Sequence, residues 1–177
     1  EHGCIYCFAR PTHAYLGLSA GLDFEAQLFA KPKAAQLLAS ELRKPGYTVR
    51  PMALGTNTDP YQPIDSRYQI TREILKVLRD FKHPVSIVTK SNRVLRDIDI
   101  LSEMAEMNLA RVAISVTTLD RKLARSMEPR APTPERRIEA MKTLSQAGIP
   151  TAVMTAPVIP ALNDHEIESI LERAHEA

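Results

Sequence analysis

Apolar residues recur along the chain at two spacings, one typical of amphipathic helices and one typical of buried strands. Helical spacing predicts helices over residues 33–44, 67–81, 96–107 and 133–147, and a last helix that begins at Asp164. Short β-branched or apolar runs predict strands over residues 48–54, 85–89, 111–116 and 151–156. Ser66 and Asp164 are the expected N-caps of their helices. Glycine and proline interrupt any period in residues 1–22, which we expect to form a loop.

Helices and strands therefore alternate along the chain with short connections. This order predicts an α/β fold with a parallel sheet built from right-handed βαβ units, and a single domain over residues 1–177. Four strands are too few to close a barrel, so an open doubly wound sheet and part of a barrel both remain possible. In either architecture the functional site lies at the carboxyl ends of the strands. The residues that follow the expected strands are indeed mostly polar: Thr56 to Asp59, Lys90 with Ser91, and Thr117 with Thr118.

Composition adds few constraints. The chain has 177 residues, of which 44% are hydrophobic and 25% charged, which is ordinary for a globular domain. A net charge of +2 permits an anionic partner but does not argue for one. No apolar run approaches the roughly 20 residues of a membrane span, no signal peptide is visible, and the first residue is Glu1. Two closely spaced cysteines suit the cytosol, where thiols stay reduced, so we expect a cytoplasmic protein without a membrane partner.

Cys4 and Cys7 form a C-x-x-C pair, which has several interpretations. A zinc site would need a second pair of ligands at suitable spacing, and none follows. A thioredoxin-like redox pair normally opens a helix after a strand, whereas glycine and proline surround this pair. Two buried structural thiols are the third interpretation. A [4Fe–4S] cluster on three loop cysteines is the fourth, because a cysteine directly before Glu1 would complete the spacing C-x3-C-x2-C.

The segment Cys4-Ile5-Tyr6-Cys7-Phe8 resembles the cluster loop of the radical S-adenosylmethionine (SAM) superfamily. Four further runs resemble the branch of that superfamily related to spore photoproduct lyase, often called DNA repair photolyases: residues 53–63, 88–91, 115–119 and 128–132. This resemblance implies a partial (β/α)6 TIM-type barrel, of which these residues would lack the first and last strands. It also implies a [4Fe–4S] cluster and SAM as cofactors.

The resemblance implies roles for particular residues. Cys4 and Cys7 would be cluster ligands, and Tyr6 would lie against the adenine of SAM, unless it is simply packed on the rim. The run Thr56, Asn57, Thr58 and Asp59 takes the place of the Gly-Gly-Glu run that binds the amino group of SAM in many relatives. Its oxygens are able to accept from an ammonium, although an Asx-type turn before a proline would explain the same residues.

Lys90 would pair with the carboxylate of SAM, and Ser115 would be a neighbouring polar contact to the same cofactor. The alternatives are a solvated lysine and a serine that faces a helix. Arg130 and Arg137 either bind a carboxylate or pair with Glu128 or Glu135. For Arg137, a surface ion pair is the favoured interpretation. All five histidines are expected at the surface or in loops.

The resemblance implies reductive cleavage of SAM to a 5′-deoxyadenosyl radical, with a reducing electron donor as partner and an unknown substrate. Photoproduct-lyase activity itself is not carried over. A nucleic-acid-binding repair-type protein is a second hypothesis, but acidic residues interrupt its only basic stretch, residues 121–137. A zinc or thiol redox α/β protein without SAM chemistry is the third hypothesis.

Overall fold

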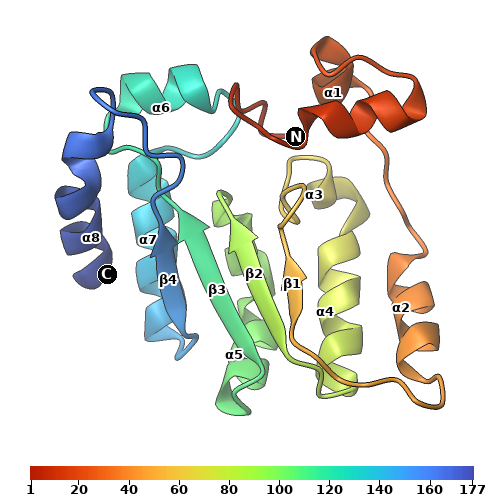
Figure 1. The fold of residues 1–177 in the computed structure, drawn as a ribbon. Helices are drawn as coiled ribbons and strands as arrows, with labels where there is room; N and C mark the ends of the chain where they lie inside the picture. Colours follow the sequence, from red (N-terminus) through yellow and green to blue (C-terminus); the bar gives the residue numbers. More distant parts are fainter.

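A computed structural model describes all 177 residues and shows four strands in one parallel sheet. The strands are β1 (Met52–Leu54), β2 (Val85–Thr89), β3 (Ala110–Ser115) and β4 (Thr151–Met154), and they lie in this order across the sheet (Figure 1). Each strand pairs with the next along the chain, so that Val85 lies opposite both Met52 and Ala110. Such an order, with a helical crossover after each strand, is the arrangement of a (β/α) barrel, and the open sheet confirms the predicted partial barrel.

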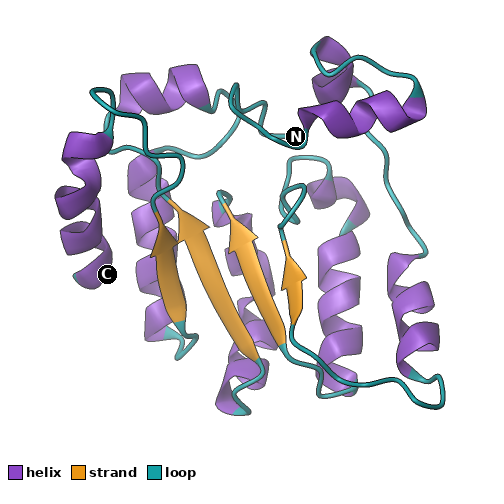
Figure 2. Ribbon diagram, in the orientation of Figure 1, coloured by secondary structure: helices purple, strands orange, loops and turns teal.

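Helices cover one face of the sheet (Figure 2). The crossover helices are α4 (Ile70–Asp80), α5 (Ile98–Glu106) and α7 (Pro134–Gln146), with α2 (Ala34–Leu42) beside α4 and α8 (Ile167–His175) near β4. The core lies between these helices and the strand residues that face them, including Ile87, Val112 and Ile114, each at most 1% exposed. The opposite face carries small or half-exposed residues such as Val88, Ala113 and Ala152, and it corresponds to the inside of the partial barrel.

Several element boundaries differ from the expectations. The first strand covers only Met52–Leu54, because the three residues from Thr48 to Arg50 are exposed and unpaired. The helix expected over residues 67–81 is α4 and begins only at Ile70. Gln69 has a left-handed backbone (φ 50°), which separates α4 from the short helix α3 (Asp65–Tyr68). Ser66 lies within α3 and donates to the Pro63 carbonyl, so its predicted capping role is wrong.

Other differences lie near the two ends of the chain. Residues 1–22 contain a 3-10 helix, Arg10–Leu16, and lead into α1 (Leu22–Ala26). A helix that the apolar spacing did not reveal, α6 (Arg121–Met127), is capped by the Asp120 carboxylate. Asp164 starts a 3-10 turn rather than capping α8. His2, His13 and His83 are buried. His2 and His83 lie in loops, as expected, whereas His13 lies in the 3-10 helix, so the prediction of a surface or loop position is wrong for His13.

No helix of the structure combines the length and the apolar character needed to cross a membrane.

Candidate functional site

The N-terminal loop lies across the carboxyl ends of the strands, on the side to which the arrows point in Figure 1. Two backbone hydrogen bonds join it to the segment that follows α6. The Ile5 N–H donates to the Met127 carbonyl at 3.0 Å, and the Arg130 N–H donates to the His2 carbonyl at 3.0 Å. The two cysteines are therefore held directly above the sheet edge at which a barrel binds its ligands.

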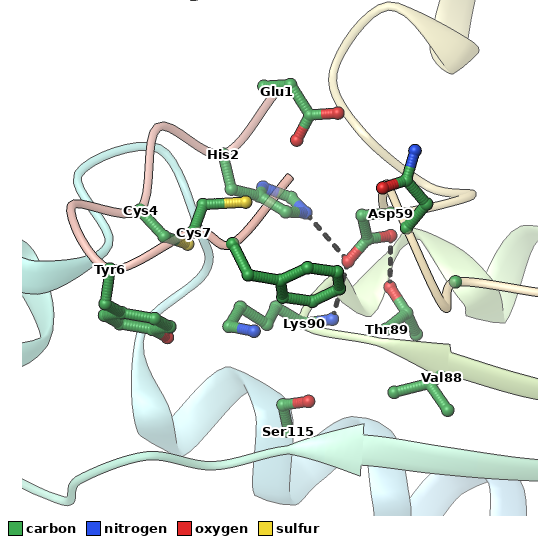
Figure 3. A pocket seen from close by; sticks show the side chains of 13 residues that line it. Glu1, His2, Cys4, Tyr6, Cys7, Asp59, Val88, Thr89, Lys90 and Ser115 are labelled. Atoms are coloured by element: carbon green, nitrogen blue, oxygen red, sulfur yellow. Dashed lines mark hydrogen bonds and ion pairs between the residues drawn. The ribbon is translucent and has the colours of Figure 1, made fainter. Parts of the chain in front are cut away.

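Beneath this loop is a cavity of about 120 Å³ (Figure 3). Thirteen residues from the N-terminal loop and the ends of β1, β2 and β3 line it: Glu1, His2, Cys4, Tyr6, Cys7, Phe8, Gly55, Asn57, Asp59, Val88, Thr89, Lys90 and Ser115. A second cavity, of about 470 Å³, shares Tyr6, Lys90 and Ser115 with the first and adds Thr56. The first cavity thus brings together most of the expected ligands and cofactor contacts, namely Cys4, Cys7, Tyr6, Asn57, Asp59, Lys90 and Ser115, and the second cavity adds Thr56.

Two expected contacts lie elsewhere. Thr58 lines a third cavity, on the side of β1 that faces α3 and α4. Arg130 lines none of these cavities, and its guanidinium pairs with Glu25 at 2.6 Å. Ser115, in contrast, faces the cavity rather than a helix, which decides between the two orientations that strand alternation left open.

Both cysteines are free thiols that line the same cavity. Cys4 is 7% exposed and Cys7 is half-buried. Burial raises the pKa of the Cys4 thiol to about 11, although the nearby Lys90 opposes this shift. A buried thiol of this kind becomes a thiolate when a metal replaces its proton. No group of three or more His, Cys, Asp or Glu side chains in these 177 residues is arranged to hold a metal ion.

Lys90 presents a free cation to this cavity. Its ammonium lies 5.7 Å from the centre of the Tyr6 ring, and it takes part in none of the salt bridges of the chain. The Ser115 hydroxyl opens onto the same two cavities. An unpaired ammonium next to a hydroxyl donor suits a small anionic group such as a carboxylate.

Asp59 is the most highly connected side chain at the edge of the cavity, and the sequence did not reveal this. Its Oδ1 accepts from the Tyr61 N–H at 2.8 Å and from the Thr89 hydroxyl at 2.6 Å. Its Oδ2 accepts from the Lys90 N–H at 2.8 Å and lies 3.1 Å from His2 Nε2. Burial alone would raise the pKa of Asp59, but the contacts with His2, Thr89 and Lys90 outweigh it and hold the pKa below its usual value.

A buried ion pair supports the other side of the loop. The Arg137 guanidinium donates to the Glu128 carboxylate, and both side chains are at most 2% exposed, so the prediction of a surface pair for Arg137 is wrong. Glu128 also accepts from the Tyr6 hydroxyl and from the Thr117 hydroxyl, the latter at 2.8 Å. Burial would raise the pKa of Glu128, and Arg137 and Tyr6 more than reverse that effect.

Known proteins match this chain along most of its length. An uncharacterized protein of Mycobacterium tuberculosis is 41% identical over 164 residues, which are 93% of this chain and 48% of that protein. An uncharacterized protein of Methanocaldococcus jannaschii is 37% identical over 166 residues, covering 94% of this chain and 60% of that protein. The chain therefore spans about half the length of the curated relatives that it matches.

Two solved structures have a similar fold. A mutant of spore photoproduct lyase superposes with a TM-score of 0.65 at 16% identity, over 99% of this chain and 49% of that one. Streptococcus suis SuiB bound to S-adenosylmethionine superposes with a TM-score of 0.61 at 20% identity, over 84% of this chain and 32% of that one. The family profile described as the Radical SAM superfamily matches residues 1–174. The chain belongs to the radical SAM superfamily.

Proposed function

We propose that this chain is the SAM-binding core of a radical SAM enzyme, in which Cys4 and Cys7 hold a [4Fe–4S] cluster. The observation that supports this function best is the convergence of the two thiols, the Tyr6 ring and the unpaired Lys90 ammonium on one cavity at the carboxyl ends of the strands. When bound, the cluster supplies the electron that breaks a sulfur–carbon bond of SAM, which yields methionine and a 5′-deoxyadenosyl radical.

The donor chemistry of the loop fits such a cluster. Thiolates are the ligands of [4Fe–4S] clusters, and both cysteines line the same cavity. Three thiolates leave one iron free for an exogenous ligand. Cys4 and Cys7 would supply two of these thiolates. A low-potential electron donor completes the proposed reaction, and the cytosol, with its reduced thiols, is the proposed compartment.

The residues of the cavity would bind and orient SAM. The Lys90 ammonium would pair with its carboxylate, and the Ser115 hydroxyl would donate to the same group. Oxygens of Thr56 and Asn57 would accept from its ammonium, and the Tyr6 ring would stack on its adenine. We leave Thr58 and Arg130 out of this set, because Thr58 lines another cavity and Arg130 is engaged with Glu25.

The test is anaerobic reconstitution with iron and sulfide, performed on the natural protein with any residues that flank this chain. Visible absorption and SAM cleavage under strong reductant are compared between the wild type and Cys4→Ala. We expect a brown wild type that cleaves SAM and a variant that does neither. A wild type that takes up zinc, or no metal, would contradict the proposal and return the cysteines to a redox or structural role.

A further inference from the structure

The strongest unassigned feature of the site is the link between Asp59 and His2, which are 57 positions apart in the sequence. We propose that Asp59 is a positioning residue that fixes the cysteine loop, through His2, at a set place relative to Lys90. This inference rests on the proposed function for its consequence in SAM binding, but the physical link itself is tested without any cofactor.

The carboxylate of Asp59 is engaged by contacts within the protein, three hydrogen bonds and one close approach of an imidazole. An ionised carboxylate offers about four acceptor positions on its two oxygens. Oδ1 accepts from the Tyr61 N–H and the Thr89 hydroxyl, and Oδ2 accepts from the Lys90 N–H and lies 3.1 Å from His2 Nε2. Figure 3 marks the contacts with Thr89, Lys90 and His2. The side chain is only 10% exposed. Asp59 therefore acts within the protein, and the binding of a cofactor ammonium falls to the oxygens of Thr56 and Asn57.

His2 is held at both its side chain and its backbone. Its ring lies against Asp59, its carbonyl accepts from the Arg130 N–H at 3.0 Å, and the residue is 4% exposed. Only Gly3 separates His2 from Cys4. Gly3 has a φ of +74°, and a Cβ atom at this position would lie 3.1 Å from Arg130 Nη1 and 3.2 Å from Glu25 Oε2. Because Gly3 is tightly packed, the position of His2 also sets the position of Cys4.

The same oxygen of Asp59 serves both sides of the proposed reaction centre. Oδ2 contacts His2 in the cysteine loop and the backbone N–H of Lys90 at the end of β2. The cysteine loop and Lys90, which would both contact SAM, are thus positioned by contacts with the same atom. Fixing their separation in advance reduces the conformational entropy that is lost on binding.

The first experiment uses hydrogen exchange on the natural protein, purified without cluster. Asp59→Asn removes the charge and replaces one acceptor by a donor, which faces the donor of His2 or Thr89. We expect the amides of residues 3–7 to exchange about tenfold to a hundredfold faster, as the loss of a buried polar contact predicts. The control is Asp164→Asn, the same change at an exposed carboxylate, which should leave these amides unchanged.

A second variant, His2→Ala, removes the link without touching the other three contacts of Asp59, and so serves even if Asp59→Asn folds poorly. Both variants should accelerate exchange in the loop, and the double variant should be no faster than the faster single one. Unchanged exchange in His2→Ala, or additive effects in the double variant, would overturn the inference.

A third measurement connects the link to SAM. In reconstituted protein, His2→Ala should raise the KM for SAM about tenfold or more while the iron content stays that of the wild type, because the loop still binds the cluster but no longer at a fixed distance from Lys90. An unchanged KM would contradict the positioning role. A wild type that binds no cluster would end the proposed function, whereas the exchange data would still decide on the link.

Discussion

Two carboxylates hold the N-terminal loop, and they do so in opposite ways. Asp59 lies at the edge of the cavity, accepts from two backbone N–H groups and one hydroxyl, and lies 3.1 Å from an imidazole. Glu128 lies in a fully buried position, where a guanidinium balances its charge and two hydroxyls complete its shell. A carboxylate balanced by a buried guanidinium becomes part of the core, whereas one held mainly by backbone N–H and hydroxyl donors sets local geometry. We therefore expect Glu128 to govern stability and Asp59 to govern position.

The largest effect should come from Arg137→Met, which leaves the buried Glu128 carboxylate without its guanidinium partner. Breaking a buried ion pair by removing one partner costs about 3–5 kcal/mol, and we expect a loss of that size in the free energy of unfolding, measured by urea denaturation. The matched control is Arg130→Met, which removes a guanidinium from the more exposed pair with Glu25 and should cost less than about 1 kcal/mol. Equal losses of unfolding free energy in Arg137→Met and Arg130→Met would contradict the special role of the buried Glu128 pair in stability.

The next effect concerns the loop that carries Asp59. Gly55 has a φ of +93°, and a Cβ atom there would lie 2.0 Å from the Val88 carbonyl oxygen. Gly55→Ala should cost about 3 kcal/mol in thermal or urea unfolding, since it adds a clash with backbone to a left-handed conformation. Gly46→Ala is the control, because Gly46 also has a positive φ but nothing within 4 Å of its Cβ position. We expect about 1 kcal/mol for it. Similar losses at both glycines would mean that the loop moves freely away from β2.

Two smaller effects compare the two carboxylates, Asp59 and Glu128, directly. Thr89→Val and Thr117→Val each delete one buried hydroxyl that donates to a carboxylate, Asp59 and Glu128 respectively, with little change in shape. Each should lower the unfolding free energy by about 1–2 kcal/mol. Only Thr89→Val should accelerate hydrogen exchange in residues 3–7. Acceleration by Thr117→Val alone would reverse the assignment of roles.

The smallest expected effect is one of pH. The pKa of Glu128 in the folded state lies below its ordinary value, so its contribution is present above that ordinary value and is lost as pH falls through the folded pKa. The unfolding free energy of the wild type should thus decline on acidification below about pH 4. Glu128→Gln should show a shallower decline in the same titration, and identical slopes would contradict a depressed pKa.

The sequence predicted the parts of the fold that depend on local pattern. The β-branched run Val85–Thr89 and the proline and glycine that bound α7 are local signals, and the structure contains both elements close to the expected limits. Thr48–Arg50 carries a β-branched pattern but finds no neighbouring strand, so it stays outside the sheet. Helix α6 is only seven residues long, too short for its apolar spacing to stand out.

The site was predictable only where the residue type itself carries chemistry. Cys4, Cys7 and Lys90 are noticeable because thiols and a lysine after an apolar strand are unusual, and the structure brings them to one cavity. Arg137 was misplaced because a charged residue on a helix normally faces solvent, whereas its burial depends on Glu128 reaching it from another segment. The link from His2 to Asp59 spans 57 positions and leaves no local trace in the sequence.

The backbone of Lys90 is held in place, whereas its ammonium is unpaired. Its main chain is bound to Asp59 and continues from β2, while its ammonium has no carboxylate partner. Because the backbone of Lys90 is fixed, its ammonium can reach an anion only within the few ångströms that its four methylene groups span. The length of the Lys90 side chain then decides which anionic ligands can be bound. A shorter cationic side chain at this position should lose a ligand that still binds when a different charged residue at the edge of the cavity is changed.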